Sequence, residues 1–479
     1  MRSNMTKALH ELTIKEIHSG YLNKEFTCVD LVKHLLNRIE KYDQKLNVFL
    51  SLNPDVLKQA EIIDKEITEK GIDRPLLGVP FGVKDNFLTK DMPTTASSNI
   101  LKGYMPQYES TVTQKLLDAG AIFIGKTNMD SFAHGSSTET SDFGPTLNPW
   151  DSGRLPGGSS GGSAAAVSAQ FVPVAIGSET AGSIRQPSAW CGVVGMKPTY
   201  GRVSRYGVIA MGSSLDSPGP ITRNVYDSAL ITEIIAGKDV RDATTSPTAV
   251  EKYSEFVGKK DLTGVKIGLV KEYLLDEMKP EVKTLINEAA EKLRQLGATV
   301  EEVSLMDPKY AIGVYTVIQR SEVSSNLARY DGIRFGHSRD SFCQETKRRI
   351  MLGTYTLSAG YYDAFYKKAQ AVRTKIVNEF SDIFKQYDAV IGAVSPGPAQ
   401  KVGATKDQPM FGEMEDVLVE PSSIAGLTSF GVPCGFVDGL PIGLQITCDQ
   451  LNEKKAVEIA DCFTQNTNHI LFPDLDKTI

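Results

Sequence analysis

The most informative stretch of the chain is the glycine- and serine-rich segment Pro156-Gly-Gly-Ser-Ser-Gly-Gly-Ser-Ala-Ala-Ala-Val167. Flexible connectors have a similar composition, but this segment runs directly into alanines that favour a helix. A glycine-rich loop that enters a helix presents backbone N–H groups and the positive end of the helix dipole to a negative charge. The lysine of a phosphate-binding P-loop is missing. The segment therefore predicts a loop that stabilises an anion without being a P-loop.

Within this segment, Gly157-Gly-Ser159-Ser-Gly161 also matches the G-x-S-x-G nucleophile elbow. That elbow requires a strand directly before its serine, whereas the approach Asn148-Pro-Trp-Asp-Ser-Gly-Arg-Leu-Pro156 is rich in turn residues. A Ser-His-Asp triad would also need a downstream histidine, and only His337 and His469 are available. The pattern therefore favours another use of these serines.

A second segment, Leu77-Gly-Val-Pro-Phe-Gly-Val-Lys-Asp-Asn86, is an apolar, strand-like run that ends in Lys84. Most lysines are exposed on the surface. A lysine at the end of a buried strand can nevertheless lose its proton, because burial disfavours the charged form. Lys84 is therefore a candidate general base.

The third segment is Val174-Ala-Ile-Gly-Ser-Glu-Thr-Ala-Gly-Ser-Ile-Arg-Gln-Pro187, in which an apolar run gives way to small residues. Ser183 directly follows three of these small residues. Consecutive small residues allow backbone amides to converge on one point, as in an oxyanion hole. A tight turn between a strand and a helix has the same composition. Taken alone, the segment is compatible with both interpretations.

The three segments together resemble the amidase signature family, which has a serine-rich core and a Ser–Ser–Lys triad, read here as Lys84, Ser159 and Ser183. The resemblance is densest over residues 77–223 and implies an amide-hydrolysing enzyme with the α/β fold of that family. It includes the stretches Lys197-Pro-Thr-Tyr-Gly-Arg202, Ser214-Leu-Asp-Ser-Pro-Gly-Pro220 and, more weakly, Pro441-Ile-Gly-Leu-Gln445.

By this resemblance, Ser183 attacks the amide carbonyl, Ser159 relays a proton and Lys84 is the base. A serine is a poor nucleophile until a base takes its proton, and lysine serves only if burial and distance from carboxylates keep it neutral. The resemblance also implies an acyl-enzyme on Ser183. The oxyanion hole would consist of the backbone N–H groups of Thr180, Ala181, Gly182 and Ser183.

Within the family, the chain is most similar to the glutamine-hydrolysing A subunits of glutamyl- and aspartyl-tRNA amidotransferases, over residues 196–205, 324–332 and 347–363. The similarity implies that this chain releases ammonia from glutamine and passes it to a B subunit. That partner would use ATP and magnesium to activate Glu-tRNA(Gln) or Asp-tRNA(Asn), would make most of the tRNA contacts, and would be joined to this chain by a small C subunit. No metal or other cofactor is implied for this chain itself.

The same similarity assigns glutamine binding to Tyr315, Arg349 and Asp416. A guanidinium such as that of Arg349 can grip the α-carboxylate with two parallel hydrogen bonds, and Asp416 can pair with the α-ammonium. The chain departs from the usual family turn GSDTGGSIR at Glu179 and Ala181, and it has His134 where related proteins often have methionine. The alanine adds a Cβ beside the predicted oxyanion hole and is tolerated there only with a negative φ.

Two other functions stay open. A free-standing amidase for small aliphatic or aryl amides would share the Ser–Ser–Lys triad but should lack the set Tyr315, Arg349 and Asp416. A non-catalytic scaffold would keep the fold alone, and it would have no reason to retain Lys84 and both serines. The sequence therefore favours the glutamine-hydrolysing function over both alternatives.

The composition is that of a globular protein and gives no sign of nucleic-acid binding. The 479 residues are 41% hydrophobic and 23% charged, with a net charge of −6, whereas phosphate neutralisation needs clustered positive charge. The six cysteines and six histidines are scattered, without metal-ligand spacing. No apolar run is long enough for a signal peptide or a bilayer span. We therefore expect a cytoplasmic protein with reduced thiols.

Helix and strand patterns alternate over residues 27–42, 265–303 and 372–391, which favours an α/β fold. We expect a single large α/β/α sandwich with a mixed central β-sheet flanked by helices. Residues 1–70 are expected to be an N-terminal helical part of the same domain, and residues 71–479 to be the amidase signature domain with its core at 77–223.

Overall fold

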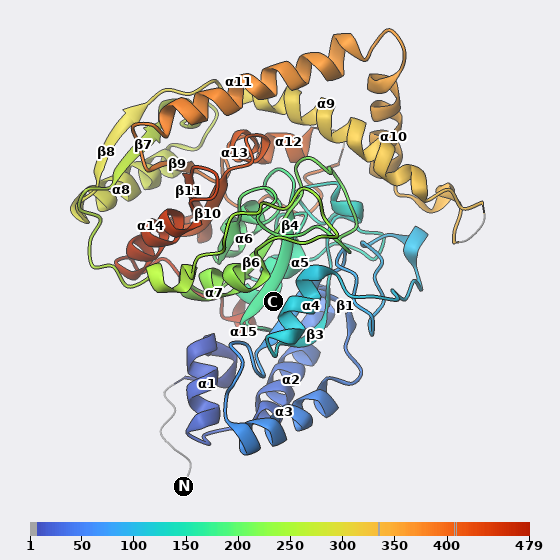
Figure 1. Cartoon of the computed structure of the whole chain (residues 1–479), viewed down its shortest axis with the longest axis vertical. Coiled ribbons are helices and arrows are strands. Elements are labelled where there is room, and N and C mark those ends of the chain that lie inside the picture. The colour runs from blue at the N-terminus through green and yellow to red at the C-terminus, as the bar shows by residue number, and fades with distance from the viewer. Residues whose placement is uncertain (1–6, 334–335, 407, 409) are drawn as a thin grey trace.

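The computed structural model describes residues 7–333, 336–406, 408 and 410–479. Within these residues, eleven strands form one sheet that runs through the molecule (Figure 1). The strands are β1 (Phe49–Leu52), β2 (Pro80–Lys84), β3 (Ile122–Thr127), β4 (Val174–Glu179), β5 (Val194–Lys197), β6 (Ser217–Thr222), β7 (Lys266–Val270), β8 (Thr299–Val303), β9 (Ala389–Ala393), β10 (Thr428–Val437) and β11 (Leu440–Cys448).

The order of strands across the sheet is β1-β3-β2-β4-β6-β5-β10-β11-β9-β7-β8. Strand β2 pairs in parallel with both β3 and β4, and β7 pairs in parallel with β8 and β9. The other neighbours, from β4–β6 to β11–β9 and β1–β3, are antiparallel. The predicted mixed sheet is confirmed. Its arrangement places the end of β2 beside the end of β4.

Helices pack on both faces of this sheet (Figure 1). They are α1 (Ile14–Leu22), α2 (Cys28–Leu46), α3 (Val56–Lys70), α4 (Thr111–Asp118), α5 (Gly161–Ser168), α6 (Arg185–Cys191), α7 (Val225–Ile235), α8 (Pro280–Gln295), α9 (Lys309–Asn326), α10 (Gln344–Leu357), α11 (Lys368–Ile383), α12 (Phe411–Glu415), α13 (Glu420–Ile424), α14 (Glu453–Gln465) and α15 (Leu475–Thr478).

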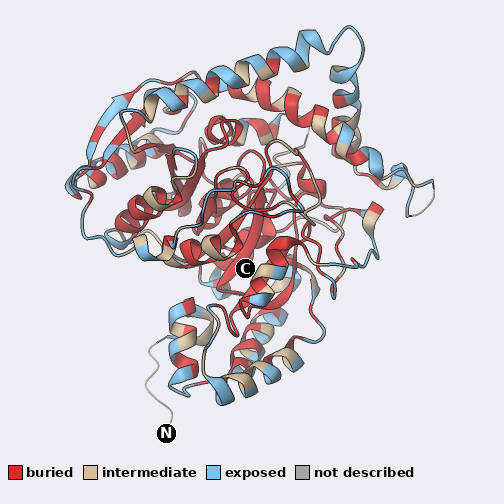
Figure 2. Cartoon of the chain, in the orientation of Figure 1, coloured by how far each residue is buried: buried red, intermediate tan, exposed pale blue. Residues whose placement is uncertain are grey.

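The three-layer arrangement follows from how side chains alternate along a strand. In β3, Ile122 and Ile124 pack with α2, α3 and α5, while Phe123 between them packs with α4 and α7. Successive side chains of a strand point to opposite faces, so these two helix groups cover opposite faces of the sheet. Figure 2 shows the sheet and the helix faces turned toward it as buried. The α/β/α sandwich predicted from the sequence is therefore confirmed.

The helices and strands with the clearest sequence signals form as predicted. Helix α2 begins after Thr27, whose hydroxyl accepts a hydrogen bond from the Asp30 N–H in a capping box. Helix α8 starts at Pro280, and Gly297, with a φ of 96°, follows its end before β8 begins. The helix and strand expected over residues 372–391 are α11 and β9.

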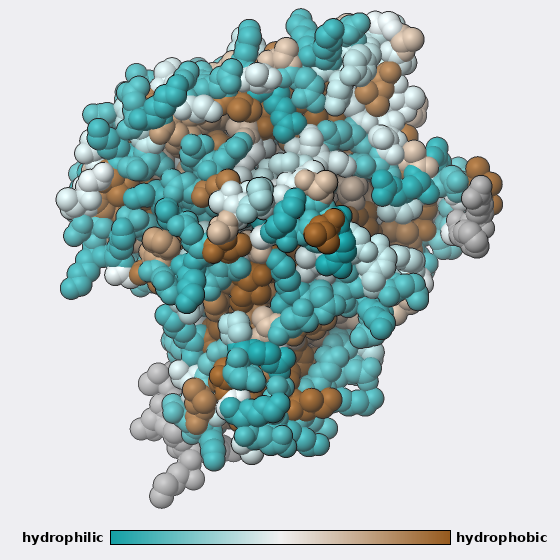
Figure 3. Space-filling model, in the orientation of Figure 1, coloured by the Kyte–Doolittle hydropathy of each residue, from teal (hydrophilic) through white to brown (hydrophobic). Residues whose placement is uncertain are grey.

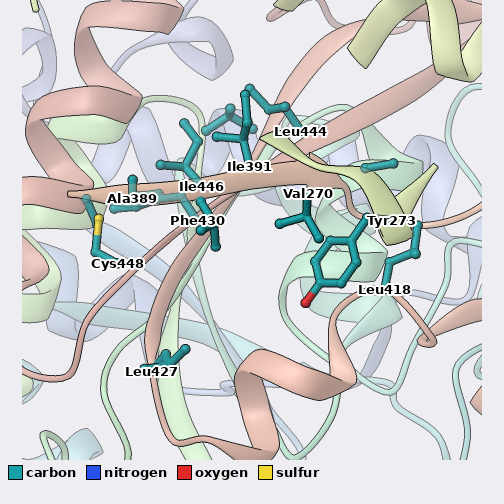
Figure 4. Packing of buried hydrophobic residues seen from close by; sticks show 14 of the residues in the cluster. Val270, Tyr273, Ala389, Ile391, Leu418, Leu427, Phe430, Leu444, Ile446 and Cys448 are labelled. Carbon is teal, nitrogen blue, oxygen red and sulfur yellow. The ribbon is translucent and has the colours of Figure 1, made fainter. Parts of the chain in front are cut away.

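The centre of the sheet is made by the last two strands of the chain. Strands β10 and β11 form an antiparallel hairpin that lies between β5 and β9. Their apolar side chains pack with those of β7 and β9 in the largest buried cluster, which Figure 4 shows from close by. Among these side chains are Phe430, Leu444 and Ile446, all with no exposed surface.

The outer surface is mostly hydrophilic on the face shown in Figure 3, with hydrophobic residues in smaller patches. No helix in the described part of the chain combines the length and the apolar character needed to cross a bilayer.

Candidate active site

The fold brings the predicted triad residues to the same end of two adjacent parallel strands. Lys84 is the last residue of β2, and Ser183 lies in the turn between β4 and α6. Ser159 lies in the loop that leads into α5. All three are buried, with exposed fractions of 0%, 4% and 0% for Lys84, Ser183 and Ser159, respectively. The Ser183 carbonyl accepts a hydrogen bond of 3.1 Å from the Ser160 N–H, which joins the two serine-bearing loops.

The Lys84 amine forms hydrogen bonds to three oxygen atoms. Its Nζ lies 2.8 Å from Ser159 Oγ, 2.8 Å from Ser160 Oγ and 3.0 Å from the carbonyl oxygen of Ser178. The sequence analysis did not single out Ser160, although it directly follows Ser159. Two serines in one motif, both within reach of the amine, are the signal that could have found it. The amine therefore has one hydrogen bond to the predicted relay serine and two further ones that hold it in place.

Burial lowers the pKa of the Lys84 ammonium to about 7. The side chain is fully enclosed, and transfer of an ammonium group out of water disfavours its charged form. A lysine with a pKa near neutrality has a substantial neutral fraction at physiological pH. It meets the requirement for a general base.

The expectation that carboxylates would be distant from this lysine is wrong. Asp130, Asp216 and Glu179 lie near enough to oppose the fall of its pKa. Each of them is already bound elsewhere. Asp130 and Asp216 accept hydrogen bonds from backbone N–H and hydroxyl groups, and Glu179 pairs with Arg185. Because none of the three contacts the amine, burial determines its pKa.

The glycine-rich loop fits into a space that larger residues would not enter. A Cβ at Gly162 would lie 2.7 Å from the Asn128 nitrogen, and one at Gly158 would lie 2.6 Å from the Ser137 nitrogen. The Gly158–Ser159 peptide bond is cis. The glycines therefore allow the backbone to approach its neighbours closely, which rules out the flexible-connector interpretation of this segment.

The turn after β4 offers free backbone N–H groups. Within the described part of the chain, no acceptor receives a hydrogen bond from the N–H groups of residues 180–183. Ala181, one of the departures from the family pattern, has a negative φ, as its Cβ requires. An oxyanion at this turn would find donors that no other group occupies.

Glu179, the other departure in this turn, holds the turn in shape. One carboxylate oxygen accepts hydrogen bonds of 3.0 Å from the N–H groups of Ile184 and Arg185, and the other accepts from the Arg185 guanidinium at 2.8 and 2.6 Å. Both side chains are fully buried. A carboxylate at the start of a helix suits its positive end, so Glu179 fixes the geometry of the predicted oxyanion hole.

The predicted substrate-binding residues come from three helical segments and lie close together. Tyr315 is on α9, Arg349 is on α10 and Asp416 caps α12, and all three are buried. Burial raises the pKa of the Tyr315 phenol, and the charges of Arg349 and Asp416 act on the same group. Asp416 also lies directly against Gly182 in the turn after β4. The three residues therefore form one cluster, which reaches the turn that carries Ser183 through Asp416.

The hydrogen bonds of this cluster show which groups are already occupied. The Arg349 Nε donates to Glu345 Oε1 at 2.6 Å. Asp416 Oδ2 accepts from the Ser136 hydroxyl at 2.6 Å, whereas Oδ1 is buried without a partner among the described residues. A cavity of about 570 Å³ opens beside Ser136 and Arg349. Asp416 thus retains a free hydrogen-bond acceptor, whereas the Arg349 guanidinium already donates one hydrogen bond to Glu345.

His134 is buried in the wall of the same cavity. Its Nδ1 lies 3.1 Å from Thr346 Oγ1, and burial lowers the pKa of the imidazole well below its usual value. The neutral imidazole of His134 thus contributes to the shape of the cavity wall. Among the described residues, no three His, Cys, Asp or Glu side chains gather as a set of metal ligands.

The fold and this arrangement of serines and lysine define a class of protein. A model of the amidase family matches residues 30–457, and the chain belongs to that family. Its relatives include the glutamyl-tRNA(Gln) amidotransferase A subunit of Staphylococcus epidermidis, 49% identical over 480 residues that cover 97% of this chain and 99% of the relative. The corresponding A subunit of Geobacillus thermodenitrificans is 47% identical over 478 residues, 96% of this chain and 98% of that one.

Solved structures agree with this assignment. The crystal structure of the glutamyl-tRNA(Gln) amidotransferase A subunit from Thermotoga maritima superposes with a TM-score of 0.82 at 39% identity, over 97% of this chain and 98% of that one. The native peptide amidase from Stenotrophomonas maltophilia superposes with a TM-score of 0.85 at 30% identity, over 98% and 99% of the two chains. The fold is thus shared with an amidotransferase component and with a peptide amidase.

Proposed function

We propose that this chain hydrolyses the side-chain amide of glutamine and supplies the ammonia to a tRNA-dependent amidotransferase. The observation that carries the proposal is the buried contact of 2.8 Å between Lys84 Nζ and Ser159 Oγ, at an amine whose pKa is about 7. The names of the near-full-length relatives support the choice of glutamine among amides.

In this mechanism the neutral amine of Lys84 accepts the hydroxyl proton of Ser159, and Ser159 takes the proton of Ser183. The Ser183 oxygen forms a bond to the amide carbon, and the N–H groups of residues 180–183 bind the resulting oxyanion. Loss of one such donor typically costs about 2.7–4 kcal/mol. Return of the proton to the amide nitrogen breaks the carbon–nitrogen bond and releases ammonia. Water then hydrolyses the acyl-enzyme to glutamate by the reverse proton path.

The proposal includes a division of labour. A B subunit uses ATP and magnesium to activate Glu-tRNA(Gln) or Asp-tRNA(Asn), makes most of the tRNA contacts and receives the ammonia, and a C subunit completes a cytoplasmic heterotrimer. The net charge of −6 supports tRNA contact mainly through the partner. We further propose that residues 1–70 and 71–479 form one domain, which the antiparallel pairing of β1 with β3 supports.

One observation favours a second candidate, a free-standing amidase. Arg349, which would grip the α-carboxylate of glutamine, already donates to Glu345, and the peptide amidase shares the fold over nearly its full length. An amidase for substrates without an α-carboxylate would not need this guanidinium.

Ammonia release by the purified chain decides between the two candidates. L-Glutamine and butanamide are compared, each with wild-type protein and Ser183→Ala. Glutamine turnover that disappears in the variant is the expected result. Turnover of butanamide alone would favour the free-standing amidase, and release of ammonia by the variant would exclude Ser183 as the nucleophile.

A further inference from the structure

Beyond the predicted substrate-binding residues, the same cluster contains a second buried carboxyl group. Glu420 is fully buried at the start of α13, and neither of its oxygen atoms has a partner among the described residues. Its N–H donates to the Asp416 carbonyl at 3.0 Å, so the two residues occupy successive turns of the chain. The two carboxyl groups lie close enough for the charge of Asp416 to act on Glu420.

Unpaired polar atoms are concentrated here. Asp416 Oδ1 and both oxygens of Glu420 have no partner in the described part of the chain, and neither do Nε and Nη1 of Arg320, whose charge acts on Glu420. A buried polar group without a partner destabilises a fold by about 1–3 kcal/mol. So many at one place indicate a site that another molecule completes.

The guanidinium and carboxyl groups at this site differ in whether they have an ion-pair partner. The two guanidiniums are already paired, Arg320 with Glu413 at 2.6 Å and Arg349 with Glu345 at 2.6 Å. Asp416 and Glu420 have no ion pair with any described residue, although both charges act on Tyr315. Each guanidinium thus has an ion-pair partner, whereas the two carboxyl groups have none among the described residues.

Asp416 brings these carboxyl groups close to the place where the amide would react. Its side chain lies against Gly182, one residue before the predicted nucleophile. A group bound between Asp416 and Glu420 is thus a few bonds from an amide held at Ser183. That separation suits a charged group on the acyl side of the substrate.

We propose that Glu420 is a specificity-determining residue, which together with Asp416 binds a cationic group on the acyl part of the amide substrate. This inference rests on the proposed amide hydrolysis at Ser183 and names its substrate class: amides that carry an ammonium group three carbons from the amide carbon, with or without a carboxylate. In glutamine that group is the α-ammonium. The α-carboxylate contributes less, because Arg349 is partly engaged.

The test begins with wild-type protein and four amides of similar length. L-Glutamine has both charges, 4-aminobutanamide only the ammonium, glutaramate only the carboxylate, and butanamide neither. We expect kcat/KM for 4-aminobutanamide to exceed that for butanamide and glutaramate by about tenfold or more, the effect of a charged hydrogen bond. Equal rates for 4-aminobutanamide and butanamide would overturn the inference, and this comparison requires no variant.

The variant Glu420→Gln then assigns the effect to one residue. We expect kcat/KM for glutamine and 4-aminobutanamide to fall by about tenfold or more, with butanamide unchanged. The control is Glu415→Gln, because Glu415 also has a buried oxygen without a partner among the described residues but is not one of the two carboxyl groups proposed to bind the ammonium, and we expect it to leave all four rates unchanged. An equal loss for all four amides in Glu420→Gln would indicate a structural role and refute the proposal.

The two hypotheses fail in distinguishable ways. If no amide releases ammonia, or if Ser183→Ala releases it as well as wild type does, the proposed hydrolysis is wrong. If amides are hydrolysed through Ser183 without a preference for the ammonium group, only the role of Glu420 is wrong.

Discussion

The side chain of Asp416 packs directly against the α-carbon of Gly182. A Cβ at Gly182 would overlap the Asp416 carboxylate and lie 2.7 Å from Cγ2 of Val419. The residue that is predicted to bind the substrate ammonium and the turn that is predicted to bind the oxyanion are therefore in contact. Any displacement of one moves the other.

Gly182→Ala is expected to impair both binding and chemistry. The added methyl group has no space, and overpacking of this kind destabilises a fold by about 1–3 kcal/mol. Denaturant unfolding and glutamine kinetics would show a lower free energy of unfolding, a higher KM and a lower kcat. The control is Gly313→Ala in the exposed part of α9, where a Cβ meets nothing within 4 Å. It should stabilise the helix by about 1 kcal/mol and leave the kinetics unchanged.

Lys84→Met should abolish amide hydrolysis while preserving the fold. Methionine fills a similar volume but can neither accept nor donate the proton, and loss of one member of a triad lowers kcat by about 10⁴-fold or more. The measurement is ammonia release from glutamine, with circular dichroism to verify folding. Full activity in this variant would refute the Ser–Ser–Lys mechanism.

The rate of hydrolysis should depend on the protonation of Lys84. Because its pKa in the folded protein is about 7, kcat/KM should rise about tenfold per pH unit below that value and level off above it. A flat profile between about pH 5.5 and 8.5 would contradict the assignment of the base.

The stability of the protein should also depend on Lys84. Its pKa is lowered from 10.5 in the folded protein, so protonation of this amine opposes folding. The free energy of unfolding of the wild type should therefore increase relative to that of Lys84→Met as the pH rises from about 7 to 10.5.

Ser159 and Ser160 lie equally close to Lys84 Nζ, and variants separate their roles. Ser159→Ala should remove the proton relay and nearly all activity. Ser160→Ala should remove only one hydrogen bond to the amine, which lowers kcat by about ten- to a hundredfold. Steady-state kinetics of both variants would reveal the difference. The reverse order of severity would assign the relay to Ser160.

Glu179→Gln should destabilise the whole protein. The buried Glu179–Arg185 pair loses one charge, and breaking such a pair costs about 3–5 kcal/mol because the remaining charge stays buried. Denaturant unfolding measures the change. Asp382→Asn, which breaks the exposed pair with Lys385, should leave the unfolding midpoint unchanged. A similar result for both variants would mean that Glu179 does not hold the turn.

Parts of the fold could be predicted because their signals are local. Thr27 and Asp30 mark the start of α2 through a capping box, and Pro280 and Gly297 frame α8. The residues of the proposed triad could be named because their motifs resemble a known family, although that resemblance did not single out Ser160, which follows Ser159 in the same motif and also contacts the lysine. That contact depends on how the loop before α5 packs against the end of β2.

The central hairpin could not be predicted in the same way. Residues 428–448 contain glycine and proline, including Gly431, Pro433 and Pro441, which locally disfavour a strand. They form strands because β5 and β9 pair with them on either side. By contrast, Glu345 and Arg349 are four residues apart on α10, the spacing at which opposite charges of one helix are expected to pair, and they do.

The place of β10 and β11 in the sheet affects how the chain matures during synthesis. The serines of the proposed triad leave the ribosome early, whereas residues 428–448 are among the last to emerge. Until then β5 and β9 expose unpaired edges and apolar faces, the features that promote aggregation of nascent chains. A nearly complete polypeptide therefore contains every residue of the triad and still lacks the middle of its sheet, so assembly of the enzyme waits for its final segment.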